Sequence, residues 1–188
     1  MAKLNNLELS LRNLAVSRLM LIVSVIALII SVFLPFYLLH LQSEKEREYE
    51  INSLGFSINS LQYELSSNIG KMKLIGNDTD PERYMVFNAL STNNLEKVLS
   101  DGRIQNISIQ LRLNRIYSRV IEINNALEFI NSDAFFSYRE KGEIDSRTSF
   151  FSQIKLNINF TKDDIYQAIT ELTDYQKCLG ETQIISNC

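Results

Sequence analysis

Histidine and cysteine, which serve as nucleophiles, proton carriers and zinc ligands, are rare in this chain. His40 is the only histidine, and the only two cysteines are Cys178 and Cys188. A protein metal site needs several ligands at close spacing, and neither a second histidine nor a cysteine lies near His40 in the sequence. Because His40 directly follows a long apolar run, we expect it to lie at a membrane interface instead.

Cys178 and Cys188 are ten positions apart and flank Gly180, so a disulfide between them would close a small loop. An oxidising compartment would favour this bond, whereas a reducing one would leave two free thiols. Neither cysteine has the spacing of a metal ligand or a histidine partner. The sequence alone leaves the bonded and the free states open.

No motif of a known enzyme chemistry occurs in the sequence: it has no glycine-rich phosphate loop, no paired histidines, no Cys-x-x-Cys and no Gly-x-Ser-x-Gly. Carboxylates gather at Asp78 and Asp80, at Asp163 and Asp164, and between residues 44 and 50. Helix N-termini and solvated helix faces account for acidic side chains at such places. We therefore predict no catalytic, cofactor-binding or metal-binding residue, and a protein that is not an enzyme.

Two polar residues, Tyr117 and Asn124, lie beside the most regular apolar pattern of the chain. They are seven positions apart, so they share one face of a helix. A buried asparagine in such a place can fix the register of packed helices. Contact with a small ligand is the alternative role of this pair, and we favour the structural one.

An uncharged run of twenty-one residues from Leu19 to Leu39 decides how the rest of the chain is read. At ~1.5 Å per residue, a helix of this length covers roughly 30 Å, the hydrocarbon thickness of a bilayer. The run is longer than the apolar part of a signal peptide and has no small-residue cleavage site behind it. It predicts a permanent transmembrane helix, and Pro35 should kink or end that helix.

The flanks of this run define the predicted organisation of the chain. We expect an amphipathic leader, or alternatively a frayed tail, at residues 1–17 and a transmembrane helix at 18–41. A charged stalk at 42–50, a helical bundle domain at 51–180 and a tail at 181–188 should follow. Three basic side chains precede the run and two follow it closely. This bias predicts a single-pass protein of the cell membrane with a cytoplasmic N-terminus and an extracytoplasmic bundle.

Apolar residues at spacings of three and four predict helices over most of the bundle. We expect a helix over 51–72, a second from Pro81 that includes Phe87 and Leu90, and a short third one capped by Asn94 and closed by Gly102. The clearest helix should cover 103–131, where one apolar seam repeats over three heptads: Ile109, Leu113, Ile116, Val120, Ile123, Leu127 and Ile130.

The last third of the chain is harder to interpret. Residues 132–149 read as a long exposed connection. Apolar and polar residues alternate over 152–160 with the period of a strand, but a strand pairing would cut into the heptad seam, so we expect a helix or an irregular turn there. Thr161 to Asp164 resembles a capping box that would begin a final helix ending at Gly180. The predicted fold class is mainly α, with one transmembrane helix followed by an antiparallel helical bundle.

Several short segments resemble a loose group of prokaryotic single-pass membrane proteins with no assigned function. The segments that carry this resemblance are Leu61–Ile69, Asn88–Leu90, Ser100–Gly102, Ile116–Tyr117 and Ile123–Asn124. The resemblance implies membrane anchoring and a helical soluble domain. It carries no functional residue over to this chain.

The partners that we predict follow from this architecture. The lipid bilayer is one, and the apolar seams indicate a protein partner or a homo-oligomer as another. A net charge of −3 gives no basic face for nucleic acid. The expected function is a membrane-anchored helical interaction or scaffold module; a bundle that senses a small ligand and acts through a partner is the alternative.

Overall fold

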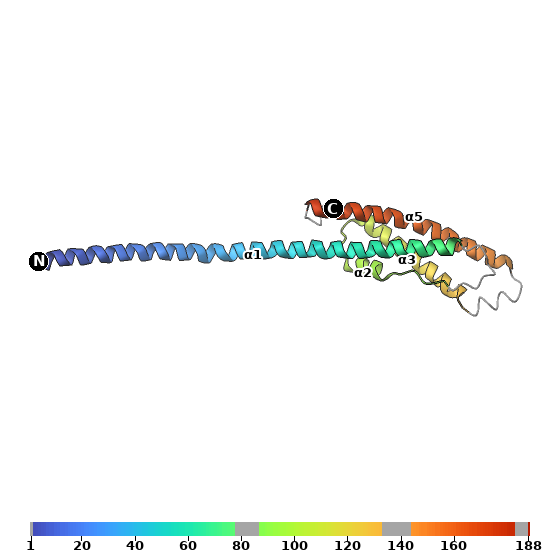
Figure 1. Cartoon of the computed structure of the whole chain (residues 1–188), viewed down its shortest axis with the longest axis horizontal. Coiled ribbons are helices and arrows are strands. Elements are labelled where there is room, and N and C mark those ends of the chain that lie inside the picture. Colours follow the sequence, from blue (N-terminus) through green and yellow to red (C-terminus); the bar gives the residue numbers. More distant parts are fainter. Residues whose placement is uncertain (1, 78–86, 133–143, 183–187) are drawn as a thin grey trace. The chain divides into compact units, whose positions relative to one another are not determined.

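The computed structural model describes residues 2–77, 87–132, 144–182 and 188, and it is mainly helical (Figure 1). Its helices are α1 (Ala2–Asn77), α2 (Asn93–Asp101), α3 (Ile107–Ile130) and α5 (Ile144–Thr182). None of the residues that the structure describes belongs to a strand. The chain divides into two compact units, Met1–Tyr49 and Glu50–Cys188.

The first unit consists of the N-terminal part of α1. This part contains one stretch that is long and apolar enough to cross a membrane, and none of that stretch is buried. The helix continues past Pro35, so the prediction that it ends there is wrong. Proline removes only one backbone hydrogen bond, and the bonds on both sides of it keep the helix intact. His40 lies exposed, with its Nε2 atom 3.6 Å from Oε1 of Glu44.

The second unit is built around one hydrophobic core, to which α1, α2, α3 and α5 all contribute. All seven residues of the predicted heptad seam on α3 are buried, which confirms that this face of the helix packs inward. From α1 the core receives a row of side chains at helical spacing: Leu54, Ile58, Leu61, Leu65, Ile69 and Met72. Burial of such apolar side chains stabilises the fold by about 1.5–3 kcal/mol each.

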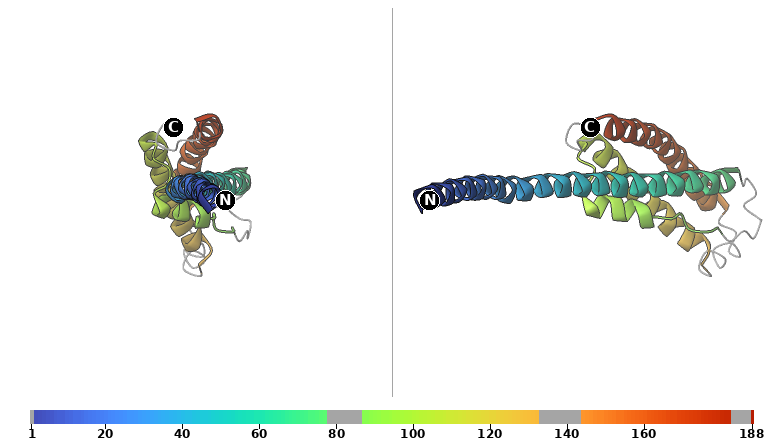
Figure 2. Two further views of the ribbon diagram at one scale, coloured as in Figure 1. Left: turned by 90° about the vertical axis from the view of Figure 1, so that its left-hand side faces the viewer. Right: turned by 60° about the vertical axis from the view of Figure 1, so that its left-hand side comes forward.

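Polar contacts fix how the helices of this unit meet. Gln176 on α5 donates from Nε2 to Oδ1 of Asn59 at 2.9 Å, and Gln62 donates from Nε2 to Oγ1 of Thr173 at 3.0 Å. Helices α1 and α5 therefore run in opposite directions where they contact each other. Helices α3 and α5 also contact each other. Figure 2 shows the helices of this unit from two further directions.

Helix α5 confirms one expectation about the last third of the chain and corrects two. It covers 152–160 without interruption, so the helix expected there is confirmed and the strand alternative is wrong: Ile154 and Ile158 are buried and Leu156 between them is exposed, which is helical spacing. Thr161 begins no helix, because its hydroxyl donates to the carbonyl of Asn157 within α5 at 2.6 Å. The helix already begins at Ile144, inside the expected exposed connection.

The segment between α1 and α2 also differs from the prediction. Residues 87–92 form no helix, although Phe87 and Leu90 have helical spacing. The predicted helix start at Pro81 lies outside the described residues. Asn94 is not the N-cap of α2, because the helix begins at Asn93 after Thr92, which makes no side-chain cap bond. Gly102 ends α2 as predicted, with a φ of 61° that suits glycine.

Candidate functional site

Three asparagine side chains bind the backbone of the non-helical segment 87–92, and we call them the asparagine clamp: Asn68 on α1, Asn124 on α3 and Asn131, which directly follows α3. The amide of Asn124 accepts from Leu90 N at 2.7 Å and donates to Leu90 O at 2.9 Å. Asn68 bonds Ser91 N and O at 2.9 and 2.7 Å.

Asn131 makes the third pair, with Phe87 N and O at 3.2 and 2.9 Å. Asn124 and Asn131 are seven positions apart, so they lie on one face of α3. Their amides replace the helix bonds that the backbone of this segment would otherwise make, which explains why the segment is not helical. The heptad spacing of these two asparagines was a signal in the sequence, whereas nothing local indicated Asn68.

The polar pair predicted from the sequence, Tyr117 and Asn124, lies on α3. Asn124 has both amide atoms engaged by Leu90. Tyr117 is half-buried and packs against the hydrophobic core. Asn124 therefore binds the backbone of a non-helical segment and not a second helix, and the choice between a structural role and a ligand contact for this pair stays a prediction.

A buried carboxylate, Glu64, caps α2 from outside that helix. Its two oxygens accept from Asn94 N at 2.9 Å and from Leu95 N at 3.1 Å, and also from the Ser91 hydroxyl at 2.9 Å. A negative charge on the N-terminal amides of a helix is favourable, because these groups have no partner within the helix. Sequence reasoning missed Glu64, since its partners lie about thirty positions away.

Arginines of α3 converge on carboxylates of α5. Arg119 and Arg115 lie 2.6 and 3.1 Å from Oδ2 of Asp164, and Nε and Nη2 of Arg112 donate to Glu171 at 2.9 and 2.8 Å. The hydrogen bond that Arg112 donates to Glu171 raises the pKa of Arg112, partial burial opposes this, and the charges of Glu171 and Asp164 add to it. Asp164 thus joins two helices and does not cap one, which corrects the sequence reading.

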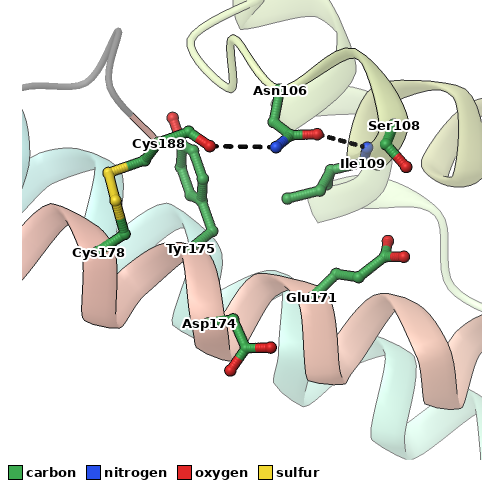
Figure 3. Close-up of a pocket in the computed structure, with 8 residues that line it drawn as sticks. All are labelled: Asn106, Ser108, Ile109, Glu171, Asp174, Tyr175, Cys178 and Cys188. Atoms are coloured by element: carbon green, nitrogen blue, oxygen red, sulfur yellow. Dashed lines mark hydrogen bonds between the residues drawn. A yellow bond between two sulfur atoms is a disulfide. The ribbon is translucent and has the colours of Figure 1, made fainter.

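A cleft of about 280 Å³ lies where the first turn of α3 meets the C-terminal part of α5 (Figure 3). Its walls are formed by Asn106, Ser108, Ile109, Glu171, Asp174, Tyr175, Cys178 and Cys188. Asn106 caps α3 by accepting from Ile109 N at 3.2 Å, and it donates to the carbonyl of Cys188 at 3.1 Å. The two cysteines are joined by a disulfide, which holds residue 188 beside α5.

The most unusual group at this cleft is the hydroxyl of Tyr175. The side chain is buried, and its oxygen has no hydrogen-bond partner of standard geometry. Burial raises the pKa of Tyr175, while the nearby backbone of Gln105 opposes this to a smaller extent. Asp174 lies on the same wall, whereas the charge of Glu171 there is already paired with Arg112, so the cleft is suited to a small polar molecule rather than an apolar one. The described part of the chain has no group of side chains placed to hold a metal ion.

No family model, curated protein or solved structure matches this chain. The resemblance to prokaryotic single-pass membrane proteins therefore stays a prediction from the sequence.

Proposed function

We propose that this protein is a single-pass membrane anchor that presents an antiparallel helical bundle as a protein-interaction module. The uncharged run from Leu19 to Leu39, exposed along its whole length, supports the anchor. The opposite directions of α1 and α5 at their contacts support the antiparallel arrangement. The disulfide between Cys178 and Cys188 favours an extracytoplasmic position of the bundle.

The observation that carries the interaction function is a row of large apolar side chains on the outward face of α1. Phe56, Tyr63 and Leu74 are 74, 79 and 73% exposed, although they belong to the same unit as the hydrophobic core. Exposed apolar groups that share a helix face are typical of surfaces that pack against another protein. We refer to the face that carries them as the outer face of α1.

Photo-crosslinking from the outer face tests this function. The full chain is produced in cells with a benzophenone amino acid at Phe56, and in a matched version at Leu111, which is exposed on α3. We expect a crosslinked protein adduct from position 56 and little from position 111. Equal yields from the two positions, or none from either, would contradict an interaction role for this face.

Small-ligand sensing is the second candidate function, and the cleft beside Tyr175 is the observation that favours it. A ligand that binds only the folded chain raises its unfolding temperature. We expect a stabilising metabolite to act on the unaltered chain and to lose its effect in Asp174→Asn. An unfolding temperature that no polar or cationic metabolite changes would contradict ligand sensing and leave the interaction module as the remaining proposal.

A further inference from the structure

The outer face of α1 has two properties that its own unit does not explain. The first is the absence of exposed charge: between Ile51 and Gly70 the only charged residue is Glu64, and it is buried beneath α2. Surface helices usually carry charged residues on the side away from the core. This side of α1 instead carries asparagine, serine and aromatic side chains.

The second property is the glycine at position 70. Gly70 is exposed within α1, seven residues before the helix ends, and a Cβ atom added there would meet nothing within 4 Å, as at Gly55. Glycine destabilises a helix interior relative to alanine, so a glycine with free space around it is a cost without a benefit inside the unit. Close approach by another helix would give it a purpose.

The spacing of these residues indicates what approaches. Phe56, Tyr63 and Gly70 are each seven positions apart, which is the repeat of one helix packing along another. Chains inserted in one membrane with the same orientation present their α1 helices in parallel, so identical residues face each other across a two-fold axis. In such a pair, a charged residue on the outer face of α1 would lie opposite the same charge of the other copy and repel it. Between Ile51 and Gly70 this face carries no charged residue.

We propose that two copies of this chain pair in parallel through the outer face of α1, with Phe56, Tyr63 and Gly70 facing the same residues of the other copy. This proposal rests on the membrane anchoring proposed above and names a second copy as the partner. In the apolar run, Ser24 and Ser31 are also seven positions apart, and small residues are common where membrane helices pair.

The size of the surface makes the pairing dependent on the membrane. Two aromatic side chains from each copy bury roughly 600–1,000 Å² in total, at about 150–250 Å² for each ring. Stable interfaces of freely diffusing proteins bury about 1,200–2,000 Å². Co-anchoring raises the effective concentration of one copy near another, so a weak interface can be occupied in the bilayer. We therefore expect dimers in vesicles and monomers at high dilution in detergent.

Cysteine crosslinking of the full chain in phosphatidylcholine vesicles tests the proposal. Tyr63→Cys should give a disulfide-linked dimer on mild oxidation, several-fold more than Leu111→Cys, which places the thiol on an exposed site of α3. The unaltered chain is the second control, since its own cysteines are paired with each other. Dimer yields from Tyr63→Cys no higher than from Leu111→Cys would overturn the proposal.

A pair of glycine variants separates pairing from folding. Gly70→Ala and Gly55→Ala both fill open space in α1, so both should raise the unfolding midpoint of the chain. Only Gly70→Ala should weaken association in vesicles, by roughly tenfold, as measured by energy transfer between labelled chains. Equal association of the two variants would overturn the role of Gly70.

Alkaline carbonate extraction of the same vesicles tells the two possible failures apart. A chain released by carbonate overturns both the anchor and the dimer. A chain that is retained but does not crosslink through position 63 overturns the dimer alone. Retention together with the crosslink is the result that we expect.

Discussion

Substitution of Asn124 by alanine should loosen the segment between α1 and α2 and destabilise the second unit. The variant removes the partners of Leu90 N and Leu90 O, which the Asn124 amide bonds at 2.7 and 2.9 Å. Leu90 is only 3% exposed, so water cannot readily replace the lost amide. Each buried polar group left without a partner costs about 1–3 kcal/mol, so we expect a loss of about 2–6 kcal/mol for the two groups.

The assay is urea unfolding of the full chain in a mild non-ionic detergent, followed by circular dichroism at the helix band. Amide hydrogen exchange adds a local readout, because the Leu90 N–H should lose its protection in Asn124→Ala before the α3 amides do. Asn125→Ala is the matched control: it removes an exposed asparagine from the adjacent position of α3 and should change stability by less than about 0.5 kcal/mol.

A result in which Asn124→Ala and Asn125→Ala unfold alike would refute the reasoning. It would mean that the clamp bonds contribute nothing beyond what solvent supplies. Unchanged protection of the Leu90 amide would lead to the same conclusion independently of the stability measurement.

Three further predictions concern other parts of the second unit. Because burial raises the folded-state pKa of Tyr175 above its ordinary value of 10.0, stability should be complete below pH 10 and should fall as the pH rises through the folded pKa; Tyr175→Phe should remove this dependence in unfolding curves measured across that range. Glu64→Ala leaves two N-terminal amides of α2 unpaired and should cost about 2–3 kcal/mol, with loss of exchange protection at Leu95; unchanged protection there would contradict the capping role. Reduction of the disulfide between Cys178 and Cys188 opens a loop of ten residues and should lower the unfolding free energy by about 2–3 kcal/mol; an unaltered midpoint in dithiothreitol would contradict this.

The helices that depend on local periodicity could be predicted from the sequence. The seam of α3 repeats over three heptads, and each of its members is buried, because a 3.5-residue repeat has one consistent helical solution. The end of α2 at Gly102 is similar, since the positive φ of that position favours glycine for a purely local reason.

The errors lie where distant side chains decide the local backbone. Residues 87–92 have helical spacing, but Asn68, Asn124 and Asn131 satisfy their backbone groups from two other helices. No pattern within the segment reveals partners that are twenty to forty positions away. The same holds for Glu64, which reads as one more surface glutamate until α2 is placed above it.

Position 161 shows a different limit. The segment from Thr161 to Asp164 has the composition of a helix start, but this composition is also compatible with the interior of a long helix. There the threonine hydroxyl bonds the carbonyl of Asn157, and Asp164 pairs with arginines of α3. Only the packing of α3 against α5 distinguishes the two readings.

Thiol labelling in intact cells is the most direct test of whether this protein is a membrane anchor with an extracytoplasmic helical unit. Cells that produce the full chain are treated with a membrane-impermeant reductant and then with a membrane-impermeant maleimide. We expect Cys178 and Cys188 to be labelled in intact cells only after reduction, and the labelled chain to stay in the membrane fraction. Labelling that requires cell lysis, or a labelled chain in the soluble fraction, would contradict it.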